Sequence, residues 1–121
     1  MLILVVGGSI FFTGCASMET GNTKSLLSAA GFRVRTPQTA QQRELYAALP
    51  SNKVERATVE GKVFYVFKDE QAGMAYVGRE AEHQRYQQLC MQQHLAQAPE
   101  EEMNPSLATR WNNQWGPARE W

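Results

Sequence analysis

The sequence predicts a small α+β domain: two short N-terminal helices, a three-stranded antiparallel meander, a long C-terminal helix packed on the sheet, and then a disordered tail. Three observations lead to this fold class. A hairpin pattern runs from Val54 to Lys68, with Glu60-Gly61 at its turn. Residues 79–97 are rich in Gln, Glu and Ala, which favour a helix. The chain of 121 residues has room for one domain with a modest core.

The first helix is expected over residues 24–30. Asn22 or Thr23 can cap its start, and Gly31 can end it in the left-handed conformation. Apolar and basic residues then alternate over 32–35, which predicts a short half-buried strand outside the meander.

The second helix is expected over residues 40–49. Thr39, with Gln42 three residues later, forms a capping-box pattern at its start. Pro50 stops it, because proline cannot continue a helix.

The meander is expected from strands at 54–59, 62–68 and 74–77. Apolar side chains of the second strand alternate between its two faces, with Val63, Tyr65 and Phe67 on one and Phe64 and Val66 on the other. Because both faces are apolar, this strand is predicted to be central and covered on both sides.

The long helix is expected to open after Gly78 and to run over 79–97. One of its faces is too apolar for a solvated helix, with Tyr86, Leu89, Cys90, Met91, Leu95 and Ala96. We expect this patch to pack on the sheet face that carries Val63, Tyr65 and Phe67. The alternative is an exposed seam between two copies of the chain, so a homo-oligomer stays open.

The first fifteen residues predict export and lipid attachment. Residues 1–12 are uncharged and mostly apolar, and Thr13-Gly14 separates them from Cys15. Such a run followed by small residues is typical of a secretory signal, and it is shorter than the roughly 18 apolar residues of a membrane-spanning helix. The ending at Cys15 resembles a bacterial lipobox, in which this thiol is diacylated and the chain is cut before it. The alternatives are an uncleaved anchor and a buried strand over residues 2–6.

Charge and cysteine content narrow the possible partners. The chain has 12 basic and 12 acidic residues, with a net charge of +4 over 16–68 and −4 over 69–121. No block of five like charges occurs, so nucleic acid is not an expected partner. If Cys15 is lipidated, Cys90 is the only other cysteine and no intramolecular disulfide forms.

Catalytic chemistry has no clear signature, and neither an enzyme nor a cofactor is expected. Cys90 and His94 lie one helical turn apart and could both reach a metal, which makes a small metal- or redox-active protein the alternative function. Zinc sites need three or four protein ligands, however, and nothing in the sequence selects the others. No metal site is therefore predicted, and these two residues are its weak candidates.

The segment after Pro99 changes in composition. It begins with Glu100-Glu101-Glu102 and carries Trp111, Trp115 and Trp121 without sustained periodicity, which predicts a flexible tail. Tryptophans among polar residues suit a partner's groove, sugar rings or a membrane interface. We therefore expect these three, with Tyr65 and Phe67 on the sheet, to bind a partner. The alternative is that the tail folds back over an exposed edge of the domain.

A run of short motifs resembles a group of small proteobacterial lipoproteins of unassigned function. The motifs are Leu26-Leu27-Ser28-Ala29-Ala30-Gly31-Phe32, Thr36-Pro37, Leu45-Tyr46, Leu49-Pro50, Tyr76-Val77-Gly78 and Gln84-Arg85-Tyr86-Gln87. More distantly, the chain is similar to the SmpA/OmlA-type lipoproteins of outer-membrane protein assembly. In such lipoproteins, Ala16 rather than Asp after the lipidated cysteine implies the outer membrane, with the domain facing the periplasm.

The expected organisation has four parts. These are a lipoprotein signal peptide over 1–14, the lipidated cysteine and a tether over 15–23, the α+β domain over 24–97, and the tail over 98–121. The expected function is that of a non-enzymatic, lipid-anchored binding or accessory module of the cell envelope, with a protein or the cell wall as partner.

Overall fold

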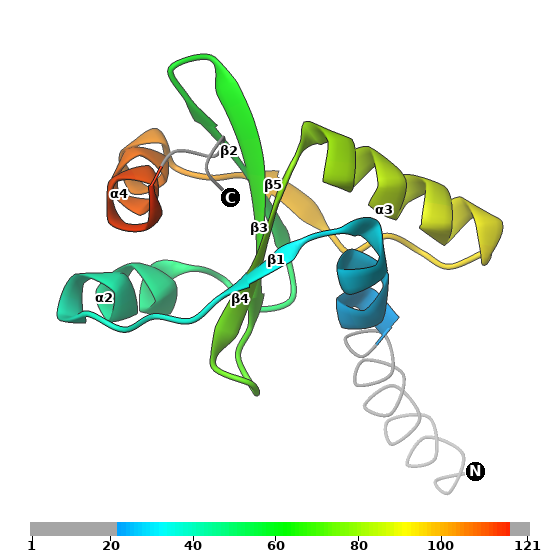
Figure 1. Ribbon diagram of the computed structural model, residues 1–121, viewed down its shortest axis with the longest axis horizontal. Coiled ribbons are helices and arrows are strands. Elements are labelled where there is room, and N and C mark those ends of the chain that lie inside the picture. Colours follow the sequence, from blue (N-terminus) through cyan, green and yellow to red (C-terminus); the bar gives the residue numbers. More distant parts are fainter. Residues whose placement is uncertain (1–21, 117–121) are drawn as a thin grey trace, which may run out of the picture.

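The computed structural model describes residues 22–116 and has an α+β fold (Figure 1). A helical segment over 22–30 is followed by a five-stranded sheet and three further helices. Their bounds are β1 Arg33–Arg35, α2 Ala40–Ala48, β2 Val54–Val59, β3 Lys62–Asp69, β4 Met74–Arg79, α3 Glu80–Gln92, β5 Glu100–Glu102 and α4 Pro105–Trp115. The strand order is β1-β4-β3-β2-β5, in which only the β2–β5 pair is parallel.

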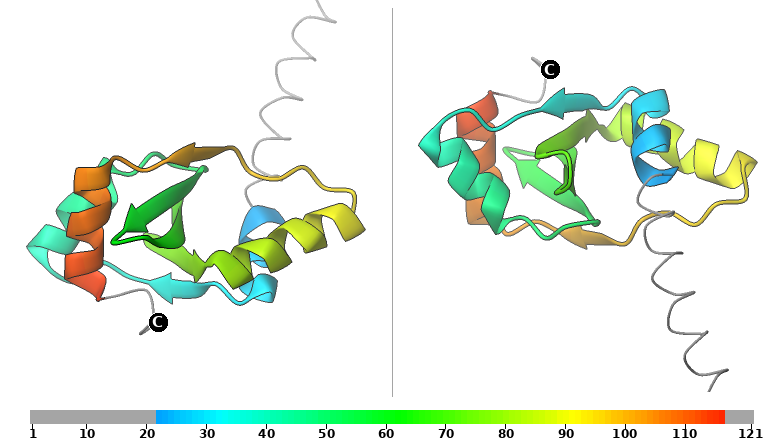
Figure 2. Two further views of the ribbon diagram at one scale, coloured as in Figure 1. Left: turned by 90° about the horizontal axis from the view of Figure 1, so that it is seen from above. Right: turned by 90° about the horizontal axis from the view of Figure 1, so that it is seen from below.

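The sheet is covered on both faces, as the pattern of β3 predicts. Figure 2 shows α2 and α4 on one side of the sheet, and segment 22–30 with α3 on the other. Phe64 and Val66 of β3 pack under α2 and α4. Tyr65 and Phe67 pack under segment 22–30 and α3. The central position of β3 and its two apolar faces are therefore confirmed.

The expected cap of the first helix at Asn22 or Thr23 is wrong, because both residues lie within the helical segment 22–30. The signals at the hairpin turn and at the end of that segment are confirmed. Val59 pairs with Lys62 across the Glu60-Gly61 turn, and both turn residues have positive φ, 53° and 77°. Segment 22–30 ends at Gly31, with φ of 103°. Each of these signals depends on residues within a few positions of one another, so it can be read from a short stretch of sequence.

The capping box of α2 is present as predicted. The Thr39 side chain accepts a hydrogen bond from the Gln42 backbone N–H at 3.1 Å, while the Gln42 side chain accepts one from the Thr39 N–H at 3.3 Å. These two bonds satisfy backbone donors that the first turn of a helix would otherwise leave unpaired.

The predicted antiparallel meander is present as β2-β3-β4, and the strand expected over 32–35 is present as β1. The expectation that the sheet has three strands is wrong, because β1 and β5 extend it at its two edges. β1 pairs antiparallel with β4, with Val34 opposite Tyr76. β5 consists of three consecutive glutamates and pairs parallel with β2. Glutamate is a poor strand former, and the pairing depends on ion pairs with residues far away in the sequence, so no local pattern indicates this strand.

The long helix is shorter than predicted at both ends. Gly78 belongs to β4, and α3 begins at Glu80 and ends at Gln92 instead of near residue 97. His94 has φ of 55°, which turns the chain out of the helix and lets the Leu95 N–H donate to the Cys90 carbonyl at 2.9 Å. Its packing on the sheet is confirmed for Tyr86 and Cys90, which are buried beside Tyr65 and Phe67. Met91 and Ala96 of the predicted patch are exposed instead, Met91 by 71%.

The predictions of a disordered tail and of a domain that ends at residue 97 are wrong. Asn104 caps α4 through bonds to the backbone N–H groups of Ser106 and Leu107, and Pro105 lies in the first turn. Trp111 is 0% exposed and belongs to the core under this helix. Phe64 and Val66 form an apolar sheet face that must be shielded from water, and α4 provides part of that shielding. Residues 117–121, and the predicted signal, Cys15 and nearly all of the tether, lie outside the described residues.

Gly78 is needed for the close packing between β4 and the residue that precedes β1. A Cβ atom at this position would lie 2.8 Å from three atoms of the Phe32 ring. We expect Gly78→Ala to lower the free energy of unfolding by about 1–3 kcal/mol in urea denaturation, because such overpacking forces the ring or the strand to move. Adding Phe32→Leu should recover part of the loss. Equal denaturation midpoints for wild type and Gly78→Ala would contradict this close approach.

Candidate functional site

Most of the side chains predicted to bind a partner lie inside the molecule. Tyr65 is 3% exposed, Phe67 1% and Trp111 0%, so none of them can contact a partner and their predicted role is wrong. Trp115 is half-buried and stacks on Trp111 with 4.1 Å between ring centroids. Trp121 lies outside the described residues. The alternative for the tail, that it folds back on its own sheet, is the arrangement found for α4.

The two weak metal-binding candidates do not share a helix face. Cys90 is 1% exposed and lies in the core, whereas His94 is exposed and follows the end of α3. Burial raises the pKa of the Cys90 thiol, which disfavours the thiolate that would bind a metal or react. Between residues 22 and 116, no group of three or more His, Cys, Asp or Glu side chains could hold a metal ion.

The burial of Cys90 leads to a direct prediction about its reactivity. We expect the folded protein to react with a thiol-specific reagent at pH 8 at least about a hundredfold more slowly than the urea-unfolded chain, because the thiol is both enclosed and protonated. Mass spectrometry of quenched time points measures both rates. Since Cys15 would also react, the measurement uses Cys15→Ser protein, and Cys90→Ser in that background is the control. Similar rates in the two states would contradict the burial of Cys90.

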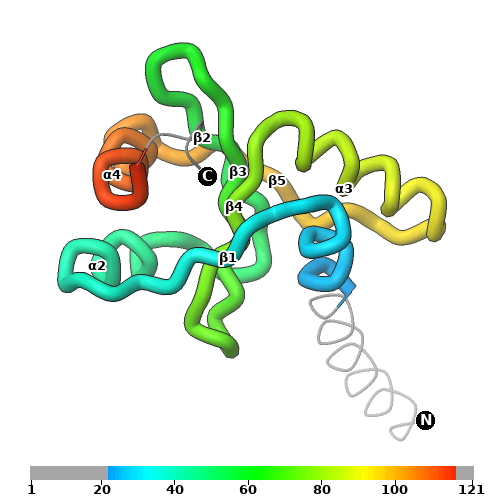
Figure 3. Tube along the Cα trace, viewed as in Figure 1, coloured from blue at the N-terminus to red at the C-terminus, as the bar shows by residue number. Residues whose placement is uncertain are grey.

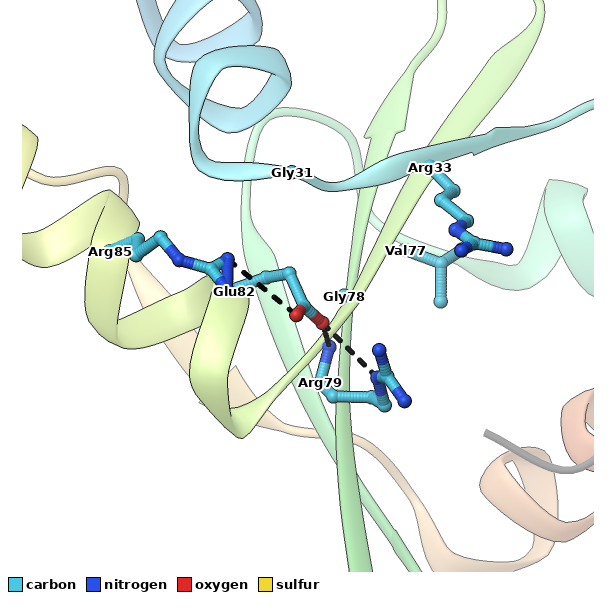
Figure 4. A pocket seen from close by; sticks show the side chains of 7 residues that line it. All are labelled: Gly31, Arg33, Val77, Gly78, Arg79, Glu82 and Arg85. Carbon is cyan, nitrogen blue, oxygen red and sulfur yellow. Dashed lines mark hydrogen bonds and ion pairs between the residues drawn. The ribbon is translucent and has the colours of Figure 1, made fainter. Parts of the chain in front are cut away.

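A small recess lined by three arginines lies where segment 22–30, β1, β4 and α3 meet (Figure 4). Its volume is about 110 Å³. The residues that line it are Gly31, Arg33, Val77, Gly78, Arg79, Glu82 and Arg85. Gly31 contributes to the open space, because a Cβ there would lie 3.4 Å from Glu82 Cγ and 3.5 Å from Arg85 Nη1.

One carboxylate serves two of these arginines. Glu82 Oε1 accepts from the Arg79 backbone N–H at 2.8 Å and from Arg79 Nε at 3.3 Å, and Glu82 Oε2 lies 3.8 Å from Arg85 Nη1. Burial by itself would raise the pKa of Glu82. The bonds from Arg79 and the charge of Arg85 outweigh that effect and lower this pKa below its usual value. Glu82 is therefore ionised at neutral pH and supplies one negative charge.

Arg33 and Arg35 bring further positive charge to the same edge of the sheet. Arg33 is opposite Val77 and Arg35 is opposite Ala75, so both arginines project on the sheet face that α2 and α4 cover. Arg79 lies two residues beyond Val77 and shares that face. Neither Arg33 nor Arg35 makes a side-chain hydrogen bond or ion pair within the part of the chain that the structure describes.

A second recess continues along β1 toward α4. Its volume is about 440 Å³, and the lining residues are Val34, Arg35, Thr36, Gln38, Gln42, Gln114 and Trp115. A hydrogen bond joins α2 to α4 at this recess: Gln42 Nε2 donates to the Gln114 backbone carbonyl at 3.0 Å. β1 thus joins the two recesses, and we name Arg33, Arg35, Arg79 and Arg85 the arginine edge.

Comparison with protein-family models, with curated proteins and with solved structures finds no match. The resemblance to small lipoproteins therefore stays a prediction from the residues. Among the helices over residues 22–116, none has the length and apolar character needed to cross a membrane.

Sequence reasoning did not find the arginine edge, although two signals pointed toward it. The alternation in Arg33-Val34-Arg35 and the net charge of +4 over residues 16–68 are both visible in the sequence. Arg79 and Arg85, however, lie more than forty residues further along the chain. Only the pairing of β1 with β4 brings them beside Arg33.

Proposed function

We propose that this protein is a non-enzymatic binding module of the cell envelope, held at the outer membrane by a lipid on Cys15, and that the arginine edge takes an anionic group of its partner. One observation carries the binding part of the proposal: four arginines lie along one edge of the sheet, and within residues 22–116 Glu82 pairs with Arg79 and Arg85 while no carboxylate pairs with Arg33 or Arg35. Guanidinium groups are planar, always charged, and suited to bidentate bonds with carboxylate or phosphate.

The docking of segment 22–30 supports the anchoring part of the proposal. Leu26 and Leu27 of this segment are buried, and Lys24 Nζ forms an ion pair of 3.0 Å with Asp69, whose side chain is 1% exposed. Six residues lie between Cys15 and Asn22, so seven steps along the chain join them, which is a reach of at most ~25 Å. A lipid on Cys15 would therefore keep the domain within a short distance of the membrane surface.

Mass spectrometry of the mature N-terminus tests the anchor. The expected product begins at Cys15, carries two or more acyl chains, and stays with the membrane fraction, because two chains give stable anchoring. Cys15→Ser protein should lose both the acyl mass and the membrane association. An unmodified Cys15, or residues 1–14 still present in the membrane-bound protein, would contradict lipid attachment.

Anion binding is tested with full-length Cys15→Ser protein, purified in detergent and titrated with tripolyphosphate. We expect saturable shifts of the arginine Nε–Hε NMR signals and a loss of affinity of about tenfold or more in Arg33→Gln/Arg79→Gln, because two of the four guanidinium groups are removed. Lys62→Gln, at the exposed first residue of β3 next to the hairpin turn, is the matched control and should bind like wild type. Shifts that do not saturate, or that persist in the double variant, would contradict the proposal.

A further inference from the structure

We propose that β1 accepts an acidic, extended segment of a partner protein as an additional strand of the sheet, with the acidic side chains of that segment bound by the arginine edge. This inference rests on the proposed function for the anion-binding role of these arginines. It goes further by naming the form in which the ligand binds and the part of the backbone that it contacts.

β1 is an open edge of the sheet within the part of the chain that the structure describes. Its one neighbour in the strand order is β4, so its outer side faces no strand within residues 22–116. Val34 in the middle of β1 is 44% exposed, which is unusual for a large apolar residue of this protein. Figure 3 shows β1 as an extended link between segment 22–30 and α2. An edge strand of this kind offers backbone N–H and C=O groups that an extended peptide can pair with.

The positive charges along that edge are regularly spaced. Arg33 and Arg35 lie two positions apart in β1 and therefore on one face, about 7 Å from each other. Side chains two positions apart in an added strand have the same spacing. A segment with an acidic residue at alternate positions would thus place one carboxylate opposite each arginine. Arg79, on the same face of β4, stands beside this pair.

The opposite edge of the same sheet already binds an acidic strand. β5 consists of Glu100, Glu101 and Glu102, and it pairs with β2 in register. Glu100 lies 2.8 Å from His83 Nε2, Glu101 3.4 Å from Lys53 Nζ, and Glu102 2.9 Å from Arg56 Nη1. Glu101 also lies opposite the buried Glu55 carboxyl in this register.

Backbone hydrogen bonds hold the same strand. The Val54 N–H donates to the Pro99 carbonyl, and the Met103 N–H donates to the Arg56 carbonyl, both at 2.8 Å. A three-residue acidic strand therefore pairs with an edge of this sheet where Lys53 and Arg56 flank it, although Glu55 faces Glu101 in the middle of the pair. β1 has the basic side chains, but no acidic strand within residues 22–116 lies on it.

Charge also excludes the simplest alternative occupant, a second copy of β1. Pairing two β1 edges would bring Arg33 and Arg35 of one copy against the same residues of the other, and like charges directly opposite each other are destabilising. An isolated anionic headgroup would use the guanidinium groups but would leave the backbone edge unpaired. An acidic peptide strand satisfies both features, so we assign that occupant.

The test uses full-length Cys15→Ser protein in detergent and a fluorescent peptide, Thr-Val-Glu-Val-Glu-Thr, with binding measured by anisotropy. A matched peptide has the same sequence with N-methyl groups on alternate residues, which keeps the charge but blocks strand pairing. We expect the unmodified peptide to bind at least tenfold more tightly than the N-methylated one. Arg33→Glu/Arg35→Glu should lose this binding and instead bind Thr-Val-Lys-Val-Lys-Thr, while Lys62→Glu should behave like wild type.

The outcomes separate this inference from the proposed function. Equal binding of the two glutamate peptides, with Arg33→Glu/Arg35→Glu weaker for both, would overturn strand addition and leave anion binding intact. If phosphatidylglycerol vesicles bind through the same arginines and the peptide does not, strand addition is also overturned and anion binding is left intact. If the peptide binds only to protein that is cut after Gly116, residues 117–121 are the segment that occupies the β1 edge. That result would overturn the proposal that a partner protein supplies the strand. If tripolyphosphate also fails to bind, the proposed function fails as well.

Discussion

Deletion of residues 104–121 is expected to abolish cooperative folding. The deleted segment contains α4, whose Ala108 and Trp111 are both 0% exposed and pack with Phe64 and Val66 of the central strand. Replacement of one buried tryptophan by alanine costs about 3–5 kcal/mol, and a domain of this size is stable by only about 5–15 kcal/mol. Loss of the whole helix also uncovers one face of β3. The expected result is an expanded chain that exposes apolar surface.

Urea denaturation followed by circular dichroism measures this effect, with Trp111→Ala as the milder variant. Trp111→Ala should lower the free energy of unfolding by about 3 kcal/mol or more. Asn113→Ala, at an exposed position of the same helix, is the control and should change stability by less than about 0.5 kcal/mol. An unchanged midpoint after the deletion would show that α4 is peripheral to the core and would contradict the packing described here.

Glu55→Gln is expected to stabilise the protein, and to do so increasingly as pH rises. Glu55 is 4% exposed and stands opposite Glu101 in the β2–β5 pair. Burial, the hydrogen bond to Glu101 and the charge of Glu101 raise the pKa of Glu55 to about 8. The Glu55 carboxyl therefore keeps its proton at neutral pH and shares it with Glu101, whose pKa is lowered by the same bond.

The sign of the pH dependence follows from proton uptake. Below pH 4.5 Glu55 is protonated in both the folded and the unfolded state, so its ionisation does not change the free energy of unfolding. Between pH 4.5 and about 8 only the unfolded state releases this proton, so the free energy of unfolding falls as pH rises. Above pH 8 the loss is complete. Glutamine cannot ionise, yet its amide can donate to Glu101 as the protonated carboxyl does.

Measurement of the free energy of unfolding from pH 5 to pH 9 tests this prediction. The gap between Glu55→Gln and wild type should widen over that range and reach roughly 2 kcal/mol or more at pH 9, since one pKa unit corresponds to about 1.4 kcal/mol. Glu60→Gln, in the exposed hairpin turn, is the control and should follow the wild-type curve. Parallel curves for Glu55→Gln and wild type would contradict a raised pKa for Glu55.

The error over the C-terminal segment is instructive, because the signals for α4 are present in the sequence. Asn104-Pro105 is a typical helix start, and Leu107, Trp111 and Trp115 recur at intervals of four. The neighbouring Glu, Asn and Pro residues suggested a solvated tail instead. Trp111 and Trp115, four residues apart, are better explained by one helix face packed against the sheet, since indole side chains gain much from burial.

The sequence alone determined those features that depend on neighbours within a few residues. It gave the capping box of α2, the left-handed end at Gly31, the turn at Glu60-Gly61 and the two apolar faces of β3, because caps, turns and alternation are local.

The tertiary structure alone decided which elements occupy the edges of the sheet. β5 lies beside β2, where its three glutamates contact Lys53, Arg56 and His83, and the arginine edge exists because β1 pairs with β4. Both arrangements join residues more than fifteen positions apart in the chain. Charges so far apart interact strongly only once folding has brought them within a few ångströms, so no local pattern records which of them will meet.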